Sequence, residues 1–265
     1  MAEVIPLFPL GTVLFPGLVL PLRVFEERYT ALVADLRQLP DESRHFGVVA
    51  IRAGWEVGVH GVSALYGVGT TARVRSVQPT DDGCFELATV GERRFRLLSV
   101  DATSKPYLLG EVEWLGESEA DDSAGVVAPF VADAFVGYVC DLAHQKAALR
   151  AAEQAQAEQG AASQARAEQG AADAMDTPTA ARAEEDPAVP MRDVRMPDDT
   201  RVLSYMVAAS VPLDLADQQS LLEAATVTDR LRAELRLIRR ERALLAQLNS
   251  VPVPLAKFAA KLSPN

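Results

Sequence analysis

The amino-acid sequence predicts an α+β protein, in which a partly open β-barrel with one early helix precedes a C-terminal helical subdomain. Three observations lead to this prediction. Short apolar runs broken by prolines change to helical spacing within the first 39 residues. Short strand-like runs separated by glycine and turn residues then continue to residue 115, which is typical of a small barrel. Between residues 199 and 248 the apolar residues recur at helical intervals.

The first 39 residues combine a bent ribbon with a helix. Runs 5–7, 13–15 and 18–22 are apolar enough for strands, but four prolines among them remove ladder hydrogen bonds. These runs therefore predict edge or bent strands. Beyond Pro21 the spacing becomes helical. The apolar positions that it places on one helix face are Phe25, Tyr29, Leu32, Val33 and Leu36.

The segment from residue 45 to residue 115 predicts the other strands. Gly67 and Gly69 indicate a bulge or bend within one of them. A hairpin turn is expected at Asp81-Asp82-Gly83, because glycine tolerates a positive φ, and another turn at Gly91-Glu92. The predicted strands cover residues 46–51, 63–78, 85–90, 93–100 and 107–115.

Composition and charge limit the class of protein. The 265 residues are 49% hydrophobic and 24% charged, which suffices for a globular core. The net charge is −11, and residues 119–200, with 16 acidic and 6 basic side chains, hold most of it. Only residues 201–265 are net basic, with 9 basic and 6 acidic side chains. Nucleic-acid binding, which requires a basic face, is therefore disfavoured.

The cysteines and the N-terminal residues predict a cytoplasmic location. Cys84 and Cys140 lie far apart and outside any metal-type spacing, which favours a reducing compartment. The first ten residues carry an acid and no basic segment of the kind that opens a secretory signal. No stretch approaches about 18 uninterrupted apolar residues, so no membrane span is expected.

Five regions follow from these patterns. The barrel is expected over residues 1–118, a helix leading out of it over 119–145, and a helical subdomain over 198–249 with a tail at 250–265. Between the helices, residues 146–197 are rich in Ala, Glu and Gln, and AEQGAA occurs at both 157–162 and 167–172. This low-complexity segment predicts a disordered insertion, either a regulatory tether or, as the favoured alternative, a tolerated surface loop.

Four segments, in this order, resemble the N-terminal substrate-binding domain of Lon proteases: PLFPLGTVLFPGLVLPLRVFEERY, YGVGTTARVRSV, VGERRFRLLSV and PYLLGEVEWL. The run with Pro21, Leu22, Val24, Phe25, Glu26, Arg28 and Tyr29 is most similar to stand-alone bacterial members. Pieces at 203–208, 218–223 and 230–231 extend the resemblance into the helices. The resemblance implies a PUA-like barrel, as also found in cereblon.

The sequence contains no recognisable catalytic centre. A phosphate-binding G-x-x-x-x-G-K-[ST] loop, a segment resembling the serine–lysine protease domain and a G-x-S-x-G motif are all missing. His45, His60 and His144 are isolated, and Cys84 has no adjacent base. We therefore expect no catalytic residue, no cofactor and no metal, and the peptide-contacting residues remain unassigned.

Charged and aromatic residues leave several alternatives open. Glu26 and Arg28 are interpreted as a helix-terminal ion pair or cap. Arg93, Arg94 and Arg96 are interpreted as a solvated strand face rather than a site for acidic ligands. Trp55 either grips an apolar peptide or folds back on the barrel. The arginines of the last expected helix form either a charged helix face or an RNA contact. They are Arg230, Arg232, Arg236, Arg239, Arg240 and Arg242.

Two classes of function remain. The favoured hypothesis, implied by the resemblance, is a non-catalytic module that recognises unfolded or degron-like peptide segments, as an adaptor in proteolysis or protein quality control. Its partners would be client proteins and a separate protease or chaperone. The alternative is a PUA-like RNA-binding protein, which the net acidity disfavours.

Overall fold

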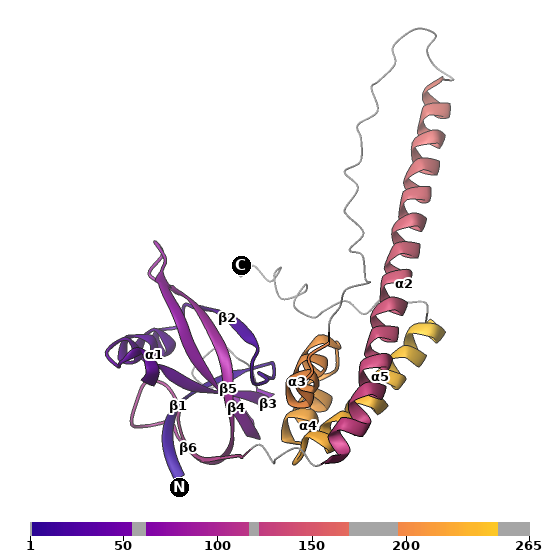
Figure 1. Cartoon of the computed structure of the whole chain (residues 1–265). Helices are drawn as coiled ribbons and strands as arrows, with labels where there is room; N and C mark the ends of the chain where they lie inside the picture. Colours follow the sequence, from indigo (N-terminus) through magenta and orange to yellow (C-terminus); the bar gives the residue numbers. More distant parts are fainter. Residues whose placement is uncertain (1, 55–61, 117–121, 170–195, 249–265) are drawn as a thin grey trace. The chain divides into compact units, whose positions relative to one another are not determined.

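A computed structural model describes residues 2–54, 62–116, 122–169 and 196–248 (Figure 1). Two compact units make up the chain: Met1–Asp133 with Pro197–Ile238, and Ala134–Met196 with Arg239–Asn265. Trp55 and His60 lie outside the described residues. In order, the elements are β1 (Ala2–Leu10), β2 (Val19–Val24), α1 (Glu27–Arg37), the 3-10 helix η1 (Asp41–Ser43), β3 (His45–Gly54), β4 (Val62–Pro79), β5 (Phe85–Asp101), β6 (Leu109–Trp114), α2 (Asp122–Gln169), α3 (Thr200–Ser210), α4 (Leu215–Glu223) and α5 (Val227–Leu248).

The six strands form a partly closed sheet, which confirms the predicted partly open barrel. Their order is β2-β5-β4-β3-β1-β6, and an additional pairing of β5 with β6 closes five of them into a ring. Strand β1 runs parallel to β3, and the other pairs are antiparallel. The first part of β5 and the last part of β4 extend beyond the ring as a hairpin, on which β2 is a third strand (Figure 1).

Of two turns that the sequence predicted, one is confirmed and the other is wrong. Gly83, with φ of 78°, forms the predicted turn between β4 and β5. The turn predicted at Gly91 is wrong, because β5 continues through this residue. A Cβ atom on Gly91 would lie 2.4 Å from the carbonyl oxygen of Phe15, so this glycine permits close approach of two backbones. The run 13–15, expected as a strand, is a loop that contributes the buried side chains of Leu14 and Phe15.

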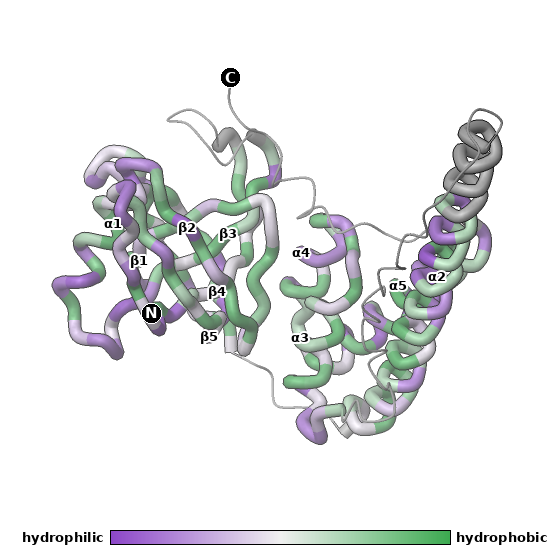
Figure 2. The backbone as a smooth tube through the Cα atoms, turned by 90° about the horizontal axis from the view of Figure 1, so that it is seen from above, coloured by the Kyte–Doolittle hydropathy of each residue, from purple (hydrophilic) through white to green (hydrophobic). Residues whose placement is uncertain are grey.

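Hydrophobic packing attaches α1 to the barrel. Tyr29, Leu32, Val33 and Leu36 are buried, as the helical spacing predicts, and the ring of Tyr29 stacks on that of Phe8 with centroids 4.0 Å apart. These residues belong to the larger hydrophobic cluster of the barrel. A smaller cluster fills the barrel and consists of Ile5, Leu7, Phe95 and Val112. Figure 2 shows hydrophobic residues along the strands and over most of α3.

A side-chain oxygen caps the N-terminus of each of the three C-terminal helices. Asp199 accepts from the backbone N–H groups of Arg201 and Val202 at the start of α3. Asp214 accepts from Asp217 N–H at 2.7 Å at the start of α4. Thr226 Oγ1 accepts from Asp229 N–H at 3.0 Å and so caps α5.

Helix α2 continues to Gln169, through residues that the sequence assigned to the insertion. Alanine, glutamate and glutamine favour helix, and a single glycine costs only about 1 kcal/mol relative to alanine, so composition alone does not end this helix. Within the second unit, Gln145 Nε2 donates to the carbonyl of Leu245 at 2.6 Å, and Arg242 Nε donates to Asp141 at 2.8 Å.

Helix α2 is more apolar than the absence of a long uninterrupted apolar run in the sequence had suggested. Within Ser123–Ala157 an 18-residue stretch has a mean hydropathy of 1.7, so this helix is long and apolar enough to cross a membrane by length and composition. One such helix is weak evidence for a membrane span, because core helices of soluble proteins meet the same criterion.

Candidate functional site

A largely apolar hollow of about 660 Å³ lies at the beginning of α1. We call it the Phe25 hollow. Its other wall is the segment that connects β5 to β6, which contributes Ala102, Pro106 and Leu108. The residues that line it are Phe25, Glu26, Glu27, Arg28, Ala31, Ala102, Pro106 and Leu108.

Phe25 is the aromatic residue among those that line this hollow. The sequence placed Phe25 on the buried helix face, and this prediction is wrong, because α1 begins only at Glu27 and the preceding Glu26 has extended backbone angles. The Phe25 side chain therefore leaves the helical register and is 59% exposed. An exposed aromatic ring beside an apolar hollow is a surface on which another apolar side chain gains by burial.

An ion pair and the exposed Glu27 form the polar part of the wall. Arg28 Nη2 lies 3.0 Å from Glu26 Oε2, and both side chains are less than one-fifth exposed. The Arg28 guanidinium also lies over the ring of Tyr29, 4.5 Å from its centroid. The ion-pair interpretation of Glu26 and Arg28 is thus confirmed. The capping interpretation is not, because Glu26 makes no side-chain cap to α1.

The opposite wall is held in place by two aspartates. Asp101 accepts from the backbone N–H groups of Thr103 at 2.7 Å and Ser104 at 3.2 Å. The Ser104 side chain, together with these N–H groups and the Thr103 hydroxyl, holds the pKa of Asp101 well below the ordinary range. Farther along, the hydroxyl of Tyr107 donates to Asp35 on α1 at 2.6 Å. The segment therefore has a fixed turn at its start and an anchor on α1 near its end.

Asp35 is the centre of that anchor. Besides the bond from Tyr107, it pairs with Lys105 Nζ at 3.0 Å. The two donors lower the pKa of the Asp35 carboxyl, whereas burial and the nearby carboxylate raise the pKa of Tyr107. A second hollow of about 300 Å³ surrounds this contact, and Pro6, Leu36 and Leu39 contribute to it.

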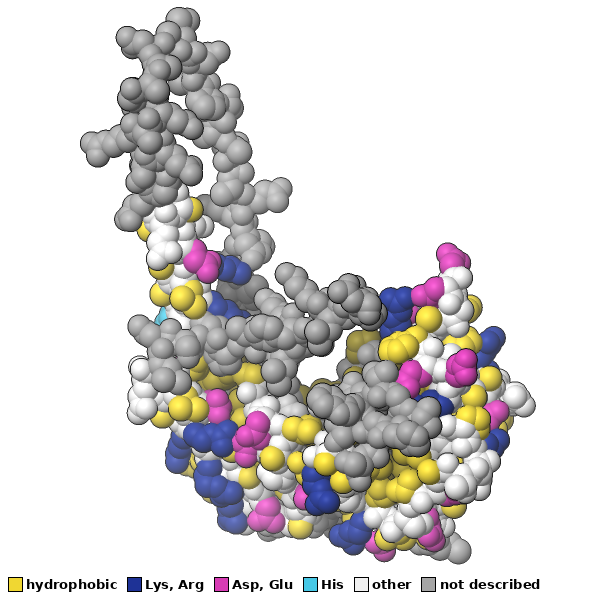
Figure 3. Space-filling model, turned by 180° about the vertical axis from the view of Figure 1, so that it is seen from behind, with side chains coloured by type: hydrophobic (Ala, Val, Ile, Leu, Met, Phe, Trp, Pro, Cys, Tyr) yellow, Lys and Arg dark blue, Asp and Glu magenta, His cyan; other side chains and the backbone are white. Residues whose placement is uncertain are grey.

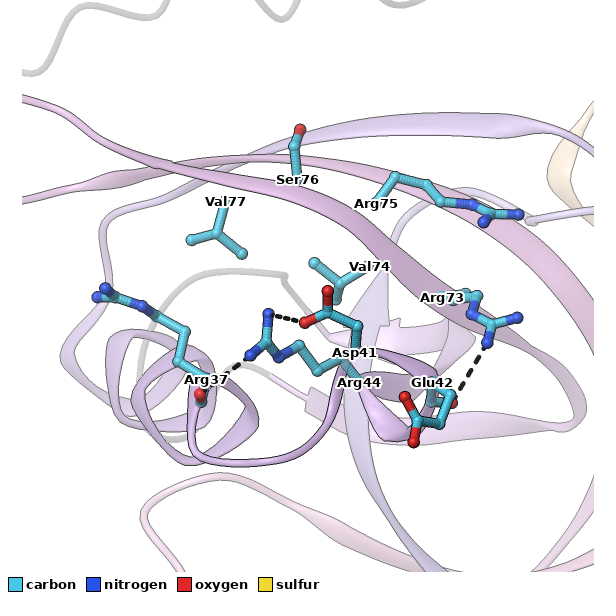
Figure 4. Close-up of a pocket in the computed structure, with 9 residues that line it drawn as sticks. All are labelled: Arg37, Asp41, Glu42, Arg44, Arg73, Val74, Arg75, Ser76 and Val77. Atoms are coloured by element: carbon cyan, nitrogen blue, oxygen red, sulfur yellow. Dashed lines mark hydrogen bonds and ion pairs between the residues drawn. The ribbon is translucent and has the colours of Figure 1, made fainter.

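A separate, basic pocket of about 680 Å³ lies at the other end of α1, against β4 (Figure 4). Arg44 pairs there with Asp41 at 2.5 Å, and Arg73 pairs with Glu92 at 2.9 Å. The lining consists of Arg37, Asp41, Glu42, Arg44, Arg73, Val74, Arg75, Ser76 and Val77.

The arginines of β5 do not form one patch. Arg93 lies over the Trp114 ring, 4.2 Å from its centroid, and Arg96 pairs with Glu113 at 3.3 Å on the surface. Arg94 is only 3% exposed, so the solvated-face interpretation is wrong for this residue. Neighbouring side chains on a strand point to opposite faces, and Arg94 is directed at the helices while Phe95 fills the barrel.

The arginines of α5 are likewise divided. Arg230 is fully buried, lies 4.0 Å from the centroid of the Tyr205 ring, and donates to the carbonyl of Leu221 and to Ser204 Oγ. It cannot belong to an exposed RNA-binding face. On the face shown in Figure 3, hydrophobic side chains lie among acidic and basic ones on the barrel.

The described residues contain no group of three or more metal-ligating side chains. His45 lies in β3 opposite Arg73, and His144 lies in α2. Cys84 and Cys140 are free thiols. Partial desolvation, together with Asp82, raises the pKa of the Cys84 thiol, which disfavours the nucleophilic thiolate.

Comparisons with known proteins point to one family. The Lon protease of Anaeromyxobacter dehalogenans is 34% identical over 126 residues, which is 47% of this chain and 14% of that protein. Lon protease 2 of Myxococcus xanthus is 31% identical over 127 residues, or 48% of this chain and 15% of that protein. This chain thus matches about one-seventh of the length of these relatives.

Solved structures show the same fold. The Lon N-terminal domain protein from Xanthomonas campestris is 22% identical with a TM-score of 0.52, over 88% of this chain and 98% of that chain. The N-terminal domain of the Mycobacterium avium complex Lon protease has the same TM-score at 18% identity, over 89% and 98% of the two chains. A model of the ATP-dependent protease La (LON) substrate-binding domain matches residues 4–240. This chain therefore belongs to the Lon substrate-binding domain family.

Proposed function

We propose that this protein binds unfolded or degron-like segments of client polypeptides without catalysing a reaction on them. The observation that carries the proposal is the exposed Phe25 ring beside a preformed apolar hollow. Membership of a substrate-binding family supports the same function. Hydrolysis would then be the task of a separate protease, to which this protein acts as an adaptor in cytoplasmic quality control.

Binding would rest on apolar burial. A Leu, Val or Phe side chain of the client would pack on Phe25, Pro106 and Leu108, and full burial of one such side chain is worth about 1.5–3 kcal/mol. One side chain alone gives weak affinity, so selectivity would favour stretches with several apolar residues. Because the Arg28 guanidinium is already paired with Glu26, the affinity would depend weakly on salt.

The test compares two phenylalanines of equal exposure. Phe25 and Phe130 are both 59% exposed, but Phe130 lies on α2 and does not line the hollow. Binding of a fluorescently labelled unfolded, apolar polypeptide would be measured by anisotropy with the full chain. We expect Phe25→Ala to weaken binding at least about tenfold, as for a central interface aromatic, and Phe130→Ala to leave it unchanged.

Two results would reject the proposal. If both substitutions had the same small effect, the hollow would not be the binding site. If the wild-type protein bound single-stranded RNA tightly, with a steep salt dependence, and bound no polypeptide, the RNA-binding alternative would replace it.

A further inference from the structure

The basic pocket lies beside an unpaired strand edge. Strand β4 pairs with β3 only as far as Arg73, whereas its pairing with β5 continues to Pro79. Beyond Arg73, the N–H group of Val74 donates to the carbonyl of Arg44 at 2.9 Å. In the described part of the chain, residues 75–79 have backbone pairing to β5 alone, and Arg75 and Ser76 are exposed. These residues leave about 16 Å of free edge at roughly 3.3 Å per residue.

Guanidinium groups surround this edge. Arg37 reaches it from the end of α1, Arg44 follows η1, and Arg73 and Arg75 belong to β4 itself (Figure 4). Asp41 compensates Arg44 and Glu92 compensates Arg73. The described residues provide no ion pair for Arg75 or for Arg37, and the Arg37 guanidinium lies 5.9 Å from the centroid of the Phe85 ring. Glu42 also lines the pocket, so the four arginines exceed the three carboxylates by one charge. The pocket is therefore net positive within a protein whose net charge is −11.

The other free edge of the hairpin, on β2, is also unpaired, but it differs in its backbone donors and in its charge. Strand β2 pairs only with β5, but Pro21 interrupts its backbone donors. Its arginine, Arg23, is already paired with Asp82 at 2.6 Å. An unpaired edge and uncompensated charge thus coincide at β4.

We propose that the β4 edge binds an extended, acidic polypeptide segment by strand addition. The main chain of the segment would extend the β4–β5 ladder, and alternate Asp or Glu side chains would meet the Arg37 and Arg75 guanidinium groups. Val74 and Val77 provide an apolar floor between these groups for the stems of the bound side chains. This site is distinct from the Phe25 hollow and selects for charge, which the hollow does not.

The experiment uses short labelled peptides with the full chain. One peptide alternates Glu with Val or Thr, a second carries Gln in place of Glu, and two more are the Glu peptide N-methylated at every second residue in either register. We expect the Glu peptide to bind, the Gln peptide to bind at least about tenfold more weakly, and one methylated register to lose binding, because strand addition requires main-chain N–H groups.

Protein variants identify the site. Arg37→Gln with Arg75→Gln removes two exposed charges and is expected to weaken binding of the Glu peptide at least about tenfold. The matched control, Arg232→Gln with Arg236→Gln on α5, changes the same charge at exposed positions away from the pocket and is expected to have no effect. Phe25→Ala is also expected to leave binding of the Glu peptide unchanged. The proposal for the Phe25 hollow and the proposal for the β4 edge can therefore be rejected independently of each other.

Three results would overturn the proposal. The first is no binding of the Glu peptide, in which case the arginines only protect an exposed edge from aggregation. The second is binding that both double variants reduce equally. The third is binding of inorganic polyphosphate or RNA at equal charge with the same affinity, together with indifference to N-methylation, which would identify a general polyanion site.

Discussion

The guanidinium of Arg94 on β5 donates to the backbone carbonyl of Leu222 in α4 at 2.7 Å, and also to that of Ala224 at 2.8 Å. Ala224 is the C-cap of α4, and carbonyls at a helix end have no partner within the helix. Gln219 of α4 adds a bond in the opposite direction, from its Nε2 to the carbonyl of Val68 on β4 at 3.0 Å. Buried polar groups thus connect the barrel and α4 within the first unit.

Replacing Arg94 with methionine is expected to lower the free energy of unfolding by about 3 kcal/mol, because two buried carbonyls lose a charged donor. Urea denaturation followed by circular dichroism measures this change. The matched control is Arg96→Met, two residues along the same strand. Arg96 and Glu113 are each more than half exposed, so a loss of no more than about 0.5 kcal/mol is expected. Similar losses for the two variants would contradict the anchoring role of Arg94.

The sequence predicted the barrel better than the roles of its charged residues. Helical spacing correctly identified Tyr29, Leu32, Val33 and Leu36 as buried, because that face depends only on the period of the helix. The alternation of β5 separates Arg94 from its neighbours in the sequence, but nothing local shows that a helix more than a hundred residues later covers that face. The same reason hides the burial of Arg230.

The candidate site was less predictable than the fold. Phe25 fits the helical spacing, and only the position of the α1 N-terminus, one residue after Glu26, moves it to the surface. The facing wall at residues 101–108 depends on Asp35, which the apolar pattern of α1 does not single out. An aspartate with threonine two residues later and serine three residues later, as at Asp101, is a turn signal that could have located this segment from the sequence.

Two glycines of β4 are expected to respond oppositely to alanine. A Cβ atom on Gly69 would lie 2.5 Å from the Val48 carbonyl oxygen and 2.5 Å from the Phe95 ring, so Gly69→Ala should destabilise the barrel by about 2 kcal/mol or more. A Cβ atom on Gly67 meets nothing within 4 Å, so Gly67→Ala should be neutral or stabilising by up to about 1 kcal/mol. Thermal denaturation of both variants tests the close approach at Gly69, and equal shifts in Tm would refute it.

The Asp35 anchor is expected to depend on pH. Because the folded protein lowers the pKa of Asp35 below its ordinary value of 3.8, the stabilisation is present above that value and is lost as pH falls through the lower folded pKa. Asp35→Asn should therefore reduce the free energy of unfolding by about 1 kcal/mol at pH 7. This value allows for solvent screening, because the Asp35 and Lys105 side chains are both exposed. The difference from wild type should shrink below about pH 4.

Urea denaturation at pH 7 and pH 3 measures that difference. Asp198→Asn is a control at an exposed aspartate that has no hydrogen bond or ion pair to the described residues. Tyr107→Phe removes the donor and should weaken the anchor without changing a charge. If the effect of Asp35→Asn were the same at both pH values, the hydrogen bonds to the ionised carboxyl would not be its source.

Glu234 on α5 is expected to make the protein less stable as pH rises. Its side chain is 1% exposed, and neither carboxyl oxygen has a hydrogen-bond partner among the described residues. Burial raises its pKa well above the ordinary 4.5, although Arg230 opposes this shift. Above pH 4.5 the unfolded chain releases the proton while the folded protein retains it, so each further pH unit, up to the folded pKa, lowers the free energy of unfolding by about 1.4 kcal/mol.

The isosteric variant Glu234→Gln removes this titration and isolates its effect. The free energy of unfolding of the variant minus that of wild type should be larger at pH 7.5 than at pH 5, because only the wild type incurs the cost of retaining a proton. Urea denaturation at the two pH values measures this difference. Arg232→Gln, an exposed change in the same helix, should show no such trend. A constant difference for Glu234→Gln would mean that the carboxylate is ionised in the folded protein, compensated by Arg230 one helical turn earlier.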